Sequence, residues 1–365
     1  MRMRFYKILF LLIISPLVLH GQSADSLGNG SVVIRYSKGF LYAHHESFKY
    51  FTKNYIPAFE INLNKRTDGT KLWHQLYHFP AVGVGYNYTD FGNPEQLGHA
   101  NSFFTFISVP LIETSKLNLS YKCAGGVAWV SKKFDLYGNI YNIAIGSNLN
   151  AYLNLNLDLD VRLINKLHLH AGIGLTHFSN GGSQQPNKGF NIFSSQLGVR
   201  YQFNDIQRIN RHDSIPGFVK RNEFSLIYGG GVKTLEPART KKYFVSSLSL
   251  NAERKLSYKT MVGLGIDLFK DNSRKEYLLS EDIQNPEGKD LFYAGGHASF
   301  DLVFGKTSFT IQMGAYFWQK SKHYESVYHR FGLKYRFSEH WLANVTLKTF
   351  WAAADFAEWG IGYRF

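Results

Sequence analysis

The residue types that could do chemistry lie near the middle of the chain. His177 and Ser179 are separated by one residue, and Asn191 follows fourteen positions after the histidine. A serine hydroxyl beside an imidazole is the nucleophile and general base pair of acyl transfer, and a third polar group commonly orients the imidazole. The pattern His-x-Ser is frequent by chance. The three residues therefore predict acyl-transfer chemistry only if the surrounding elements bring their side chains together.

The alternation of apolar and polar residues places these three side chains on one face of a predicted hairpin. Between residues 166 and 180 the apolar residues share one parity, which His177 and Ser179 continue, and a period of two is typical of a strand. On the predicted returning strand, 188–203, the apolar parity includes Asn191. A symmetric hairpin then pairs residue 177 with residue 191, and such partners have Cβ atoms about 4.5–5.5 Å apart. We expect one patch on the apolar, outward side.

The rest of the chain consists of similar alternating segments, and their length indicates the fold class. In 151–162, leucine and valine alternate with asparagine and aspartate. The segments are about 10 to 15 residues long, enough to cross a bilayer when tilted, whereas soluble strands are usually shorter. The chain ends in an amphipathic segment that closes on Phe365, as outer-membrane barrels typically do. The sequence predicts an all-β, antiparallel outer-membrane β-barrel.

The first residues predict export. Residues 1–7 carry three cations, residues 8–19 form an apolar run too short to span a membrane as a helix, and small residues follow. We expect a signal peptide over 1–21, cleaved after Gly21. Cys123 is the only cysteine, so neither a lipid anchor at the new N-terminus nor an internal disulfide is expected.

The predicted strands fall into two sets of eight, separated by a polar linker at 204–220. The predicted strands are 31–44, 56–65, 79–90, 98–111, 117–131, 148–163, 166–180 and 188–203, then 222–234, 241–254, 258–270, 290–304, 307–320, 325–337, 340–351 and 354–365. Residues 198–203 (GVRYQF) resemble the final GIGYRF, which suggests an internal duplication. Two architectures follow: two tandem eight-stranded barrels, 22–203 and 221–365, or one sixteen-stranded barrel. The long polar linker favours two barrels, because periplasmic turns within one barrel are normally short.

The charge of the chain bears on its partners. Removal of the signal peptide lowers the formal charge from +14 to +11. In an exported barrel without a nucleic-acid module, this excess favours anionic lipid head groups such as the phosphates of lipopolysaccharide over nucleic acid. His168 and His170 have one residue between them on the inward side, and we expect no metal there. The sequence leaves the oligomeric state open.

The site segment resembles a known family. Residues 175–182 (LTHFSNGG), followed by Pro186, Asn187 and Gly189, look like the active-site signature of PagL-type lipid A 3-O-deacylases over about residues 31–203. The resemblance implies an eight-stranded outer-membrane barrel acting on lipid A without metal or cofactor. It implies His177 as general base, Ser179 as nucleophile, and the backbone amides around Asn180 and Gly182 as the oxyanion hole.

The chain departs from this family at one position and lacks the motif in its second half. The family's type member has glutamate where this chain has Asn191, and asparagine can orient an imidazole without giving it a negative partner. In the second half, residues 347–352 (LKTFWA) align with 175–180, so Thr349 and Trp351 replace the histidine and serine. We expect the second half to be inert: a scaffold, a lipid-binding surface or a partner interface.

Two further functions fit the same residues. A non-catalytic barrel would be structural, would bind lipid, or would conduct ions if sixteen strands enclosed one pore. An acyltransferase would move the acyl chain to another acceptor, but nothing in the sequence specifies one. Hydrolysis is the simpler prediction.

Overall fold

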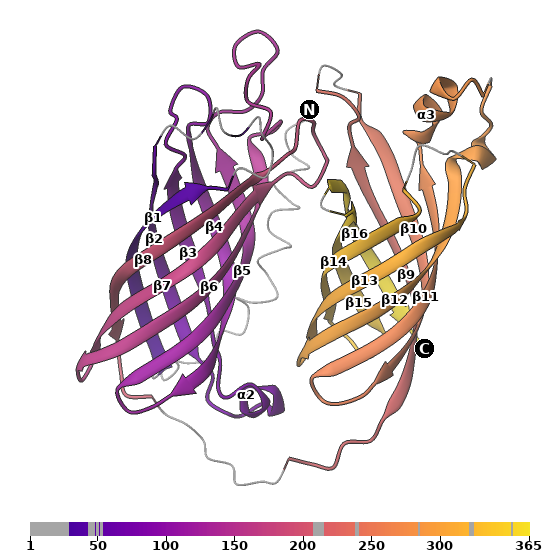
Figure 1. Ribbon diagram of the computed structural model, residues 1–365. Coiled ribbons are helices and arrows are strands. Elements are labelled where there is room, and N and C mark those ends of the chain that lie inside the picture. Colours follow the sequence, from indigo (N-terminus) through magenta and orange to yellow (C-terminus); the bar gives the residue numbers. More distant parts are fainter. Residues whose placement is uncertain are drawn as a thin grey trace, which may run out of the picture.

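The computed structural model describes residues 29–42, 48, 51, 54–206, 215–237, 241–283, 285–320, 325–351 and 353–365. Within these residues the strands form two closed antiparallel barrels of eight strands each (Figure 1). The predicted strands are confirmed to within a few residues. The alternative of one sixteen-stranded barrel is wrong, because β1 pairs with β8 and β16 pairs with β9. The predicted signal peptide, 1–21, lies outside the described residues.

The N-terminal barrel is formed by β1 to β8. Its strands are β1 (Gly30–Leu41), β2 (Ile56–Arg66), β3 (Ala81–Asp90), β4 (His99–Glu113), β5 (Leu117–Val130), β6 (Leu149–Ile164), β7 (Leu167–Ser179) and β8 (Phe190–Gln202). A short helix, α2 (Leu72–Leu76), lies in the connection between β2 and β3, to which the sequence analysis assigned no element.

The C-terminal barrel is formed by β9 to β16. Its strands are β9 (Arg221–Lys233), β10 (Tyr243–Lys255), β11 (Thr260–Asp271), β12 (Phe292–Phe304), β13 (Thr307–Trp318), β14 (Val327–Arg336), β15 (Trp341–Phe350) and β16 (Ala353–Arg364). The helix α3 (Arg274–Ser280) and the 3₁₀ turn η3 (Gly288–Leu291) lie between β11 and β12.

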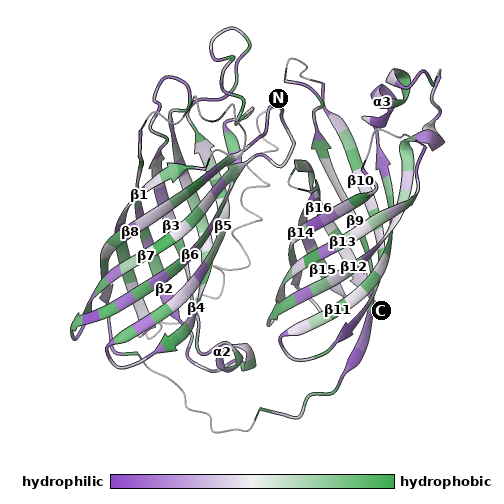
Figure 2. Ribbon diagram, in the orientation of Figure 1, coloured by the Kyte–Doolittle hydropathy of each residue, from purple (hydrophilic) through white to green (hydrophobic). Residues whose placement is uncertain are grey.

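The alternation of apolar and polar residues in the sequence gives each barrel an apolar outer face and a polar inner face. On β6 the side chains of Leu153, Leu155 and Leu157 are exposed on the outside, whereas Asn154 and Asp158 are buried inside. Figure 2 shows apolar residues alternating with polar ones along the strands of both barrels. Apolar-out and polar-in is the pattern of a barrel surrounded by lipid. Among the described residues, no helix is long and apolar enough to cross a bilayer.

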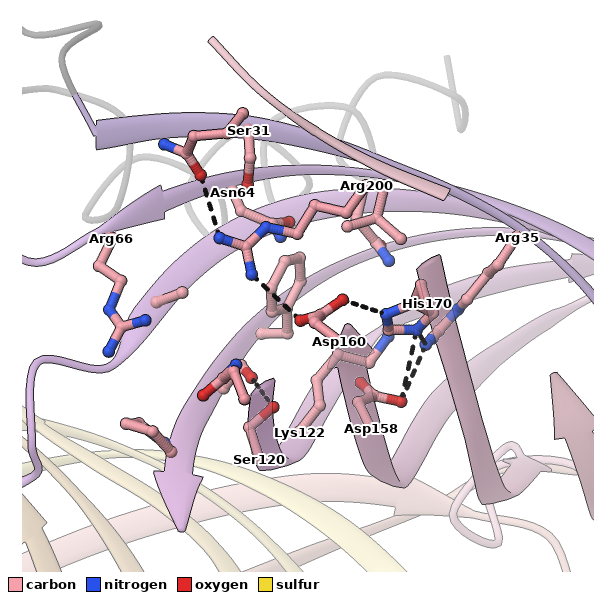
Figure 3. Close-up of a pocket in the computed structure, with 18 residues that line it drawn as sticks. Ser31, Arg35, Asn64, Arg66, Ser120, Lys122, Asp158, Asp160, His170 and Arg200 are labelled. Carbon is pink, nitrogen blue, oxygen red and sulfur yellow. Dashed lines mark hydrogen bonds and ion pairs between the residues drawn. The ribbon is translucent and has the colours of Figure 1, made fainter. Parts of the chain in front are cut away.

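Buried ion pairs fill the interior of the N-terminal barrel (Figure 3). Arg35 lies 3.3 Å from Asp158, and Asp160 lies 3.0 Å from Arg200 and 2.8 Å from the His170 imidazole. His170 is therefore a partner of a buried carboxylate. The cavity that remains among these side chains has a volume of about 40 Å³, room for little more than water.

The C-terminal barrel is closed in the same way. Asp267 lies 2.8 Å from Arg330 and 2.7 Å from His297. The buried rings of Phe269 and Tyr293, partners on the neighbouring strands β11 and β12, stack with their centroids 4.8 Å apart. The interior of an eight-stranded barrel is just wide enough to be filled by its inward-facing side chains.

These filled interiors predict that the protein conducts no ions. Purified protein inserted into planar bilayers is expected to give no current steps above those of a detergent-only control, because each interior is blocked by paired charges and rings. A porin reconstituted in parallel verifies the recording. Reproducible steps that scale with the amount of protein would contradict the two closed barrels and revive the channel function.

The two barrels contact one another at the end that carries α2. The Tyr77 hydroxyl donates a hydrogen bond of 2.9 Å to the carbonyl oxygen of Val303, and its ring stacks on Phe304 at 4.3 Å. Gly305, in the β12–β13 turn, lies against the indole of Trp73. A second contact, at the opposite end, involves the loop that follows Ser179.

Candidate active site

The β7–β8 hairpin brings His177 and Asn191 together. The two residues are direct cross-strand partners, so the predicted register is confirmed. The Nδ1 atom of His177 lies 2.7 Å from the Oδ1 atom of Asn191. With the amide oxygen as acceptor, Nδ1 carries the proton and Nε2 keeps its lone pair. This is the tautomer that a general base needs.

Gly189 makes room for the imidazole. Its φ is +71°, a conformation that favours glycine, and a Cβ atom there would lie 2.9 Å from Cε1 of His177 and 3.5 Å from Nε2. The residue that precedes β8 thus fixes the space on the reactive side of the ring. Sequence reasoning placed Gly189 in the motif but assigned it no role, because the contact depends on how the loop returns.

The close contact at Gly189 carries a prediction. Gly189→Ala is expected to displace the imidazole and lower the rate of ester hydrolysis by about 10- to 100-fold, since small misplacements of a catalytic group have effects of this size. The rate is measured as fatty acid released from lipopolysaccharide. Gly138→Ala, in the β5–β6 loop, is the control, because its Cβ would meet nothing closer than 3.5 Å. Equal activity of both variants with the parent would show that the ring does not need this space.

Ser179 ends β7 on the same side of the strand as His177. Residues two apart in a strand are about 6.6–6.8 Å apart at Cα, a span that an imidazole can bridge. The sequence predicted that this side faces lipid. His177 and Asn191 are only half-buried, but Ser179 is 6% exposed, so the serine itself is buried rather than open to lipid.

The loop from 180 to 189, called the site loop below, is held by the Asn180 side chain. Its Oδ1 accepts hydrogen bonds from the amides of Gly182 (3.1 Å) and Gln184 (3.3 Å), and its Nδ2 donates to the Gln184 carbonyl (2.7 Å). Gly181 and Gly182 both have positive φ, +64° and +84°, so the turn requires glycine at each.

The amides predicted for the oxyanion hole are already engaged in this loop. The Asn180 amide donates to Oδ1 of Asn187 at 2.9 Å, and the Gly182 amide donates to Oδ1 of Asn180. Within the described part of the chain, no hydrogen bond is found for the Gly181 amide between them. A developing oxyanion would compete with neutral amide oxygens, and charged acceptors bind amides more strongly.

The site loop contacts the C-terminal barrel, which the sequence did not predict. The Gln185 amide donates to Oγ1 of Thr234 at 2.7 Å, and the Thr234 amide donates to the Gly182 carbonyl at 3.3 Å. A Cβ atom at Gly181 would lie 3.0 Å from Cβ of Ala357. The tip of the hairpin therefore lies against the C-terminal barrel. A contact between two separately closed barrels produces no periodic pattern of apolar and polar residues in the sequence of either barrel.

The corresponding residues 347–350 of the C-terminal barrel lie on β15, which occupies the place of β7, and Trp351 follows directly after this strand. Thr349 is buried there, and Trp351 is exposed with a φ of +51°. The expectation that this segment is inert remains a prediction.

Among the described residues, no group of His, Cys, Asp and Glu side chains is arranged to hold a metal ion.

Comparison with family models assigns each barrel. Residues 58–202 match the model of the lipid A 3-O-deacylase (PagL) family, and residues 222–365 match the model described as acyloxyacyl hydrolase, C-terminal domain. Together the two models span most of both barrels. No curated protein matches the chain.

Several solved structures are similar in part. The outer-membrane enzyme PagL is 20% identical over 47% of this chain and 98% of its own, with a TM-score of 0.31. Neisserial surface protein A is 14% identical over 48% of this chain and 98% of its own, with the same TM-score. A mutant Rh. blastica porin is 10% identical over 92% of this chain and 99% of its own, with a TM-score of 0.18.

The strand pattern, the polar interiors and the two family models agree on the class of protein. The N-terminal barrel belongs to the lipid A 3-O-deacylase (PagL) family and the C-terminal barrel to the acyloxyacyl hydrolase C-terminal domain family, so the chain is an outer-membrane hydrolase.

Proposed function

We propose that the N-terminal barrel removes an ester-linked acyl chain from lipid A, with Ser179 as nucleophile and His177 as general base. The observation that carries the proposal is the 2.7 Å contact between His177 Nδ1 and Asn191 Oδ1, on the side of β7 that also bears Ser179. It supplies an oriented base in the required tautomer next to a serine. The lipid A 3-O-deacylase family supplies the substrate class.

The first half of the reaction forms an acyl-enzyme. Nε2 of His177 accepts the hydroxyl proton of Ser179 as Oγ attacks the ester carbonyl carbon. The carbonyl oxygen gains negative charge and is held by amides of the site loop, those of Asn180 and Gly182, with the Gly181 amide between them. The tetrahedral intermediate expels the sugar alkoxide, which takes the proton from the imidazolium.

The second half of the reaction regenerates the serine. Nε2 of His177 accepts a proton from water, whose oxygen attacks the acyl-enzyme carbonyl. Collapse of this second intermediate breaks the bond to Oγ, which recovers the proton from the imidazolium. A free fatty acid leaves, and lipid A has one acyl chain fewer. Asn191 orients the imidazolium through the neutral amide oxygen that lies 2.7 Å from Nδ1.

The test uses the full chain, folded in detergent and incubated with lipopolysaccharide in ¹⁸O-enriched water. Hydrolysis predicts a lipid A species lacking one acyl chain and one ¹⁸O atom in the carboxylate of the released fatty acid, both read by mass spectrometry. An acyltransferase would instead give a second acylated product without ¹⁸O. Unchanged lipid A across substrates of several acyl lengths would overturn the proposal and favour a non-catalytic, lipid-binding barrel.

A further inference from the structure

The site loop is bound at two points by a single residue of the other barrel. Thr234 follows directly after β9, and its side-chain oxygen accepts from the Gln185 amide while its own amide donates to the Gly182 carbonyl. Thr234 is 2% exposed. These two bonds span the loop from the glycine turn to the residue before Pro186, so one residue fixes its central part, 182–185.

The C-terminal barrel holds Thr234 through its own buried ion pairs. Lys233, the preceding residue, lies 2.7 Å from carboxylate oxygens of both Asp271 and Asp355, and Lys348 lies 2.6 Å from Asp355. Asp355 also presents its backbone oxygen to the site loop, where a Cβ at Gly182 would lie 2.4 Å away. One buried network thus fixes both surfaces that the loop contacts.

The outer face of β15 and β16 completes the contact. Ala357 and Leu347 are cross-strand partners on this face, and a Cβ at Gly181 would lie 3.0 Å and 3.4 Å from their side chains. Glycine in the site loop is therefore required twice, for its positive φ and for close approach to a second barrel. A barrel that acted alone would need only the first.

We propose that Thr234 is a positioning residue for the hydrolase site, and that the C-terminal barrel contributes to catalysis by holding the site loop. This inference rests on the proposed function of Ser179 and His177. The amides that would receive the oxyanion, those of residues 180–182, end at the first residue that Thr234 binds, Gly182. Displacement of such groups by about 1 Å costs on the order of 100-fold in rate. This positioning role of Thr234 gives the C-terminal barrel, which lacks the His-x-Ser motif, a part in the reaction.

The test compares Thr234→Val with Thr234→Ser in the full chain. Valine keeps the shape and removes the acceptor for the Gln185 amide, whereas serine keeps the hydroxyl. We expect kcat to fall by about 10- to 100-fold in Thr234→Val with KM unchanged, and Thr234→Ser to restore it. Tyr77→Phe is the matched control, since it removes the inter-barrel hydrogen bond at the far end. It is expected to retain parental kcat.

A second variant perturbs the same contact without removing a hydrogen bond. Ala357→Leu adds bulk against Gly181 and is expected to lower kcat similarly, whereas Ala315→Leu adds the same bulk at an exposed position on β13 of the same barrel and is expected to leave it unchanged. Resistance to trypsin and the heat-modified gel mobility of each variant verify folding.

The outcomes separate this inference from the function on which it rests. Parental kcat in both Thr234→Val and Ala357→Leu, in an enzyme that Ser179→Ala inactivates, would overturn the positioning role and leave the proposed function intact. Equal losses in Thr234→Val and Thr234→Ser, or in Tyr77→Phe, would also overturn it, since they would indicate a general effect on barrel docking. A parent that releases no fatty acid, or a Ser179→Ala protein that still does, would instead refute the proposed function.

Discussion

Ser179→Ala is expected to lower the rate of fatty acid release from lipopolysaccharide by at least about 10³-fold while the protein still binds the substrate. Removal of the nucleophile from a serine hydrolase leaves only what the oxyanion hole and substrate binding contribute, and losses of this size or larger are typical. The measurement is kcat from released fatty acid, with binding followed by co-elution of lipopolysaccharide. Both readouts use the full chain.

Ser195→Ala provides the matched control for this experiment. Ser195 lies on β8 of the same hairpin and is exposed on its outer side, opposite Ile173. It is expected to retain parental activity. A Ser179→Ala protein with more than about one tenth of the parental rate would contradict the assignment of the nucleophile, because water activated by the imidazole alone does not approach that rate.

The strand arrangement could be predicted from sequence because a barrel wall has only two environments. Lipid outside and paired charges inside impose a period of two along every strand, so even the register of His177 and Asn191 followed from parity and a symmetric hairpin. The choice between one barrel and two followed from the polar linker. The helices α2 and α3 were missed because each is less than three turns long and lies in a connection.

The candidate site was predicted less completely, because its remaining parts depend on contacts between chain segments far apart. The hydrogen bonds between Thr234 and the site loop, from the Gln185 amide and to the Gly182 carbonyl, join barrels that close separately. The occupation of the Asn180 and Gly182 amides by side-chain oxygens depends on the fold of the loop. Neither produces periodicity or a motif.

The two barrels differ at the elements through which the site loop meets the C-terminal barrel. The N-terminal barrel carries the histidine and serine on β7, while the equivalent strand β15 presents Leu347 to the site loop. Small residues on both sides, Gly181 and Ala357, allow this approach. The C-terminal barrel, which lacks the histidine and serine at the matching positions, thus contacts and holds the site loop of the N-terminal barrel.

Asn191 offers the sharpest test of how the base is oriented. Asn191→Leu removes the acceptor that lies 2.7 Å from His177 Nδ1, so this contact no longer favours a proton on Nδ1 over one on Nε2. We expect kcat to fall by about 10²- to 10⁴-fold, the upper figure being the loss that follows Asp→Asn in a serine protease triad. Asn191→Glu and Asn191→Asp are expected to raise kcat above the parent, because a carboxylate stabilises the imidazolium that an amide only orients.

The interpretation is checked in the Ser179→Ala background. If Asn191 acts only through His177 on Ser179, adding Asn191→Leu to Ser179→Ala lowers the residual rate no further, since residues that act as a unit are not additive. Independent losses that multiply would show that Asn191 supports the fold of the hairpin. A carboxylate variant slower than the parent would show that the site is built around a neutral partner, and that this chain departs from the glutamate of the family's type member in mechanism as well as in sequence.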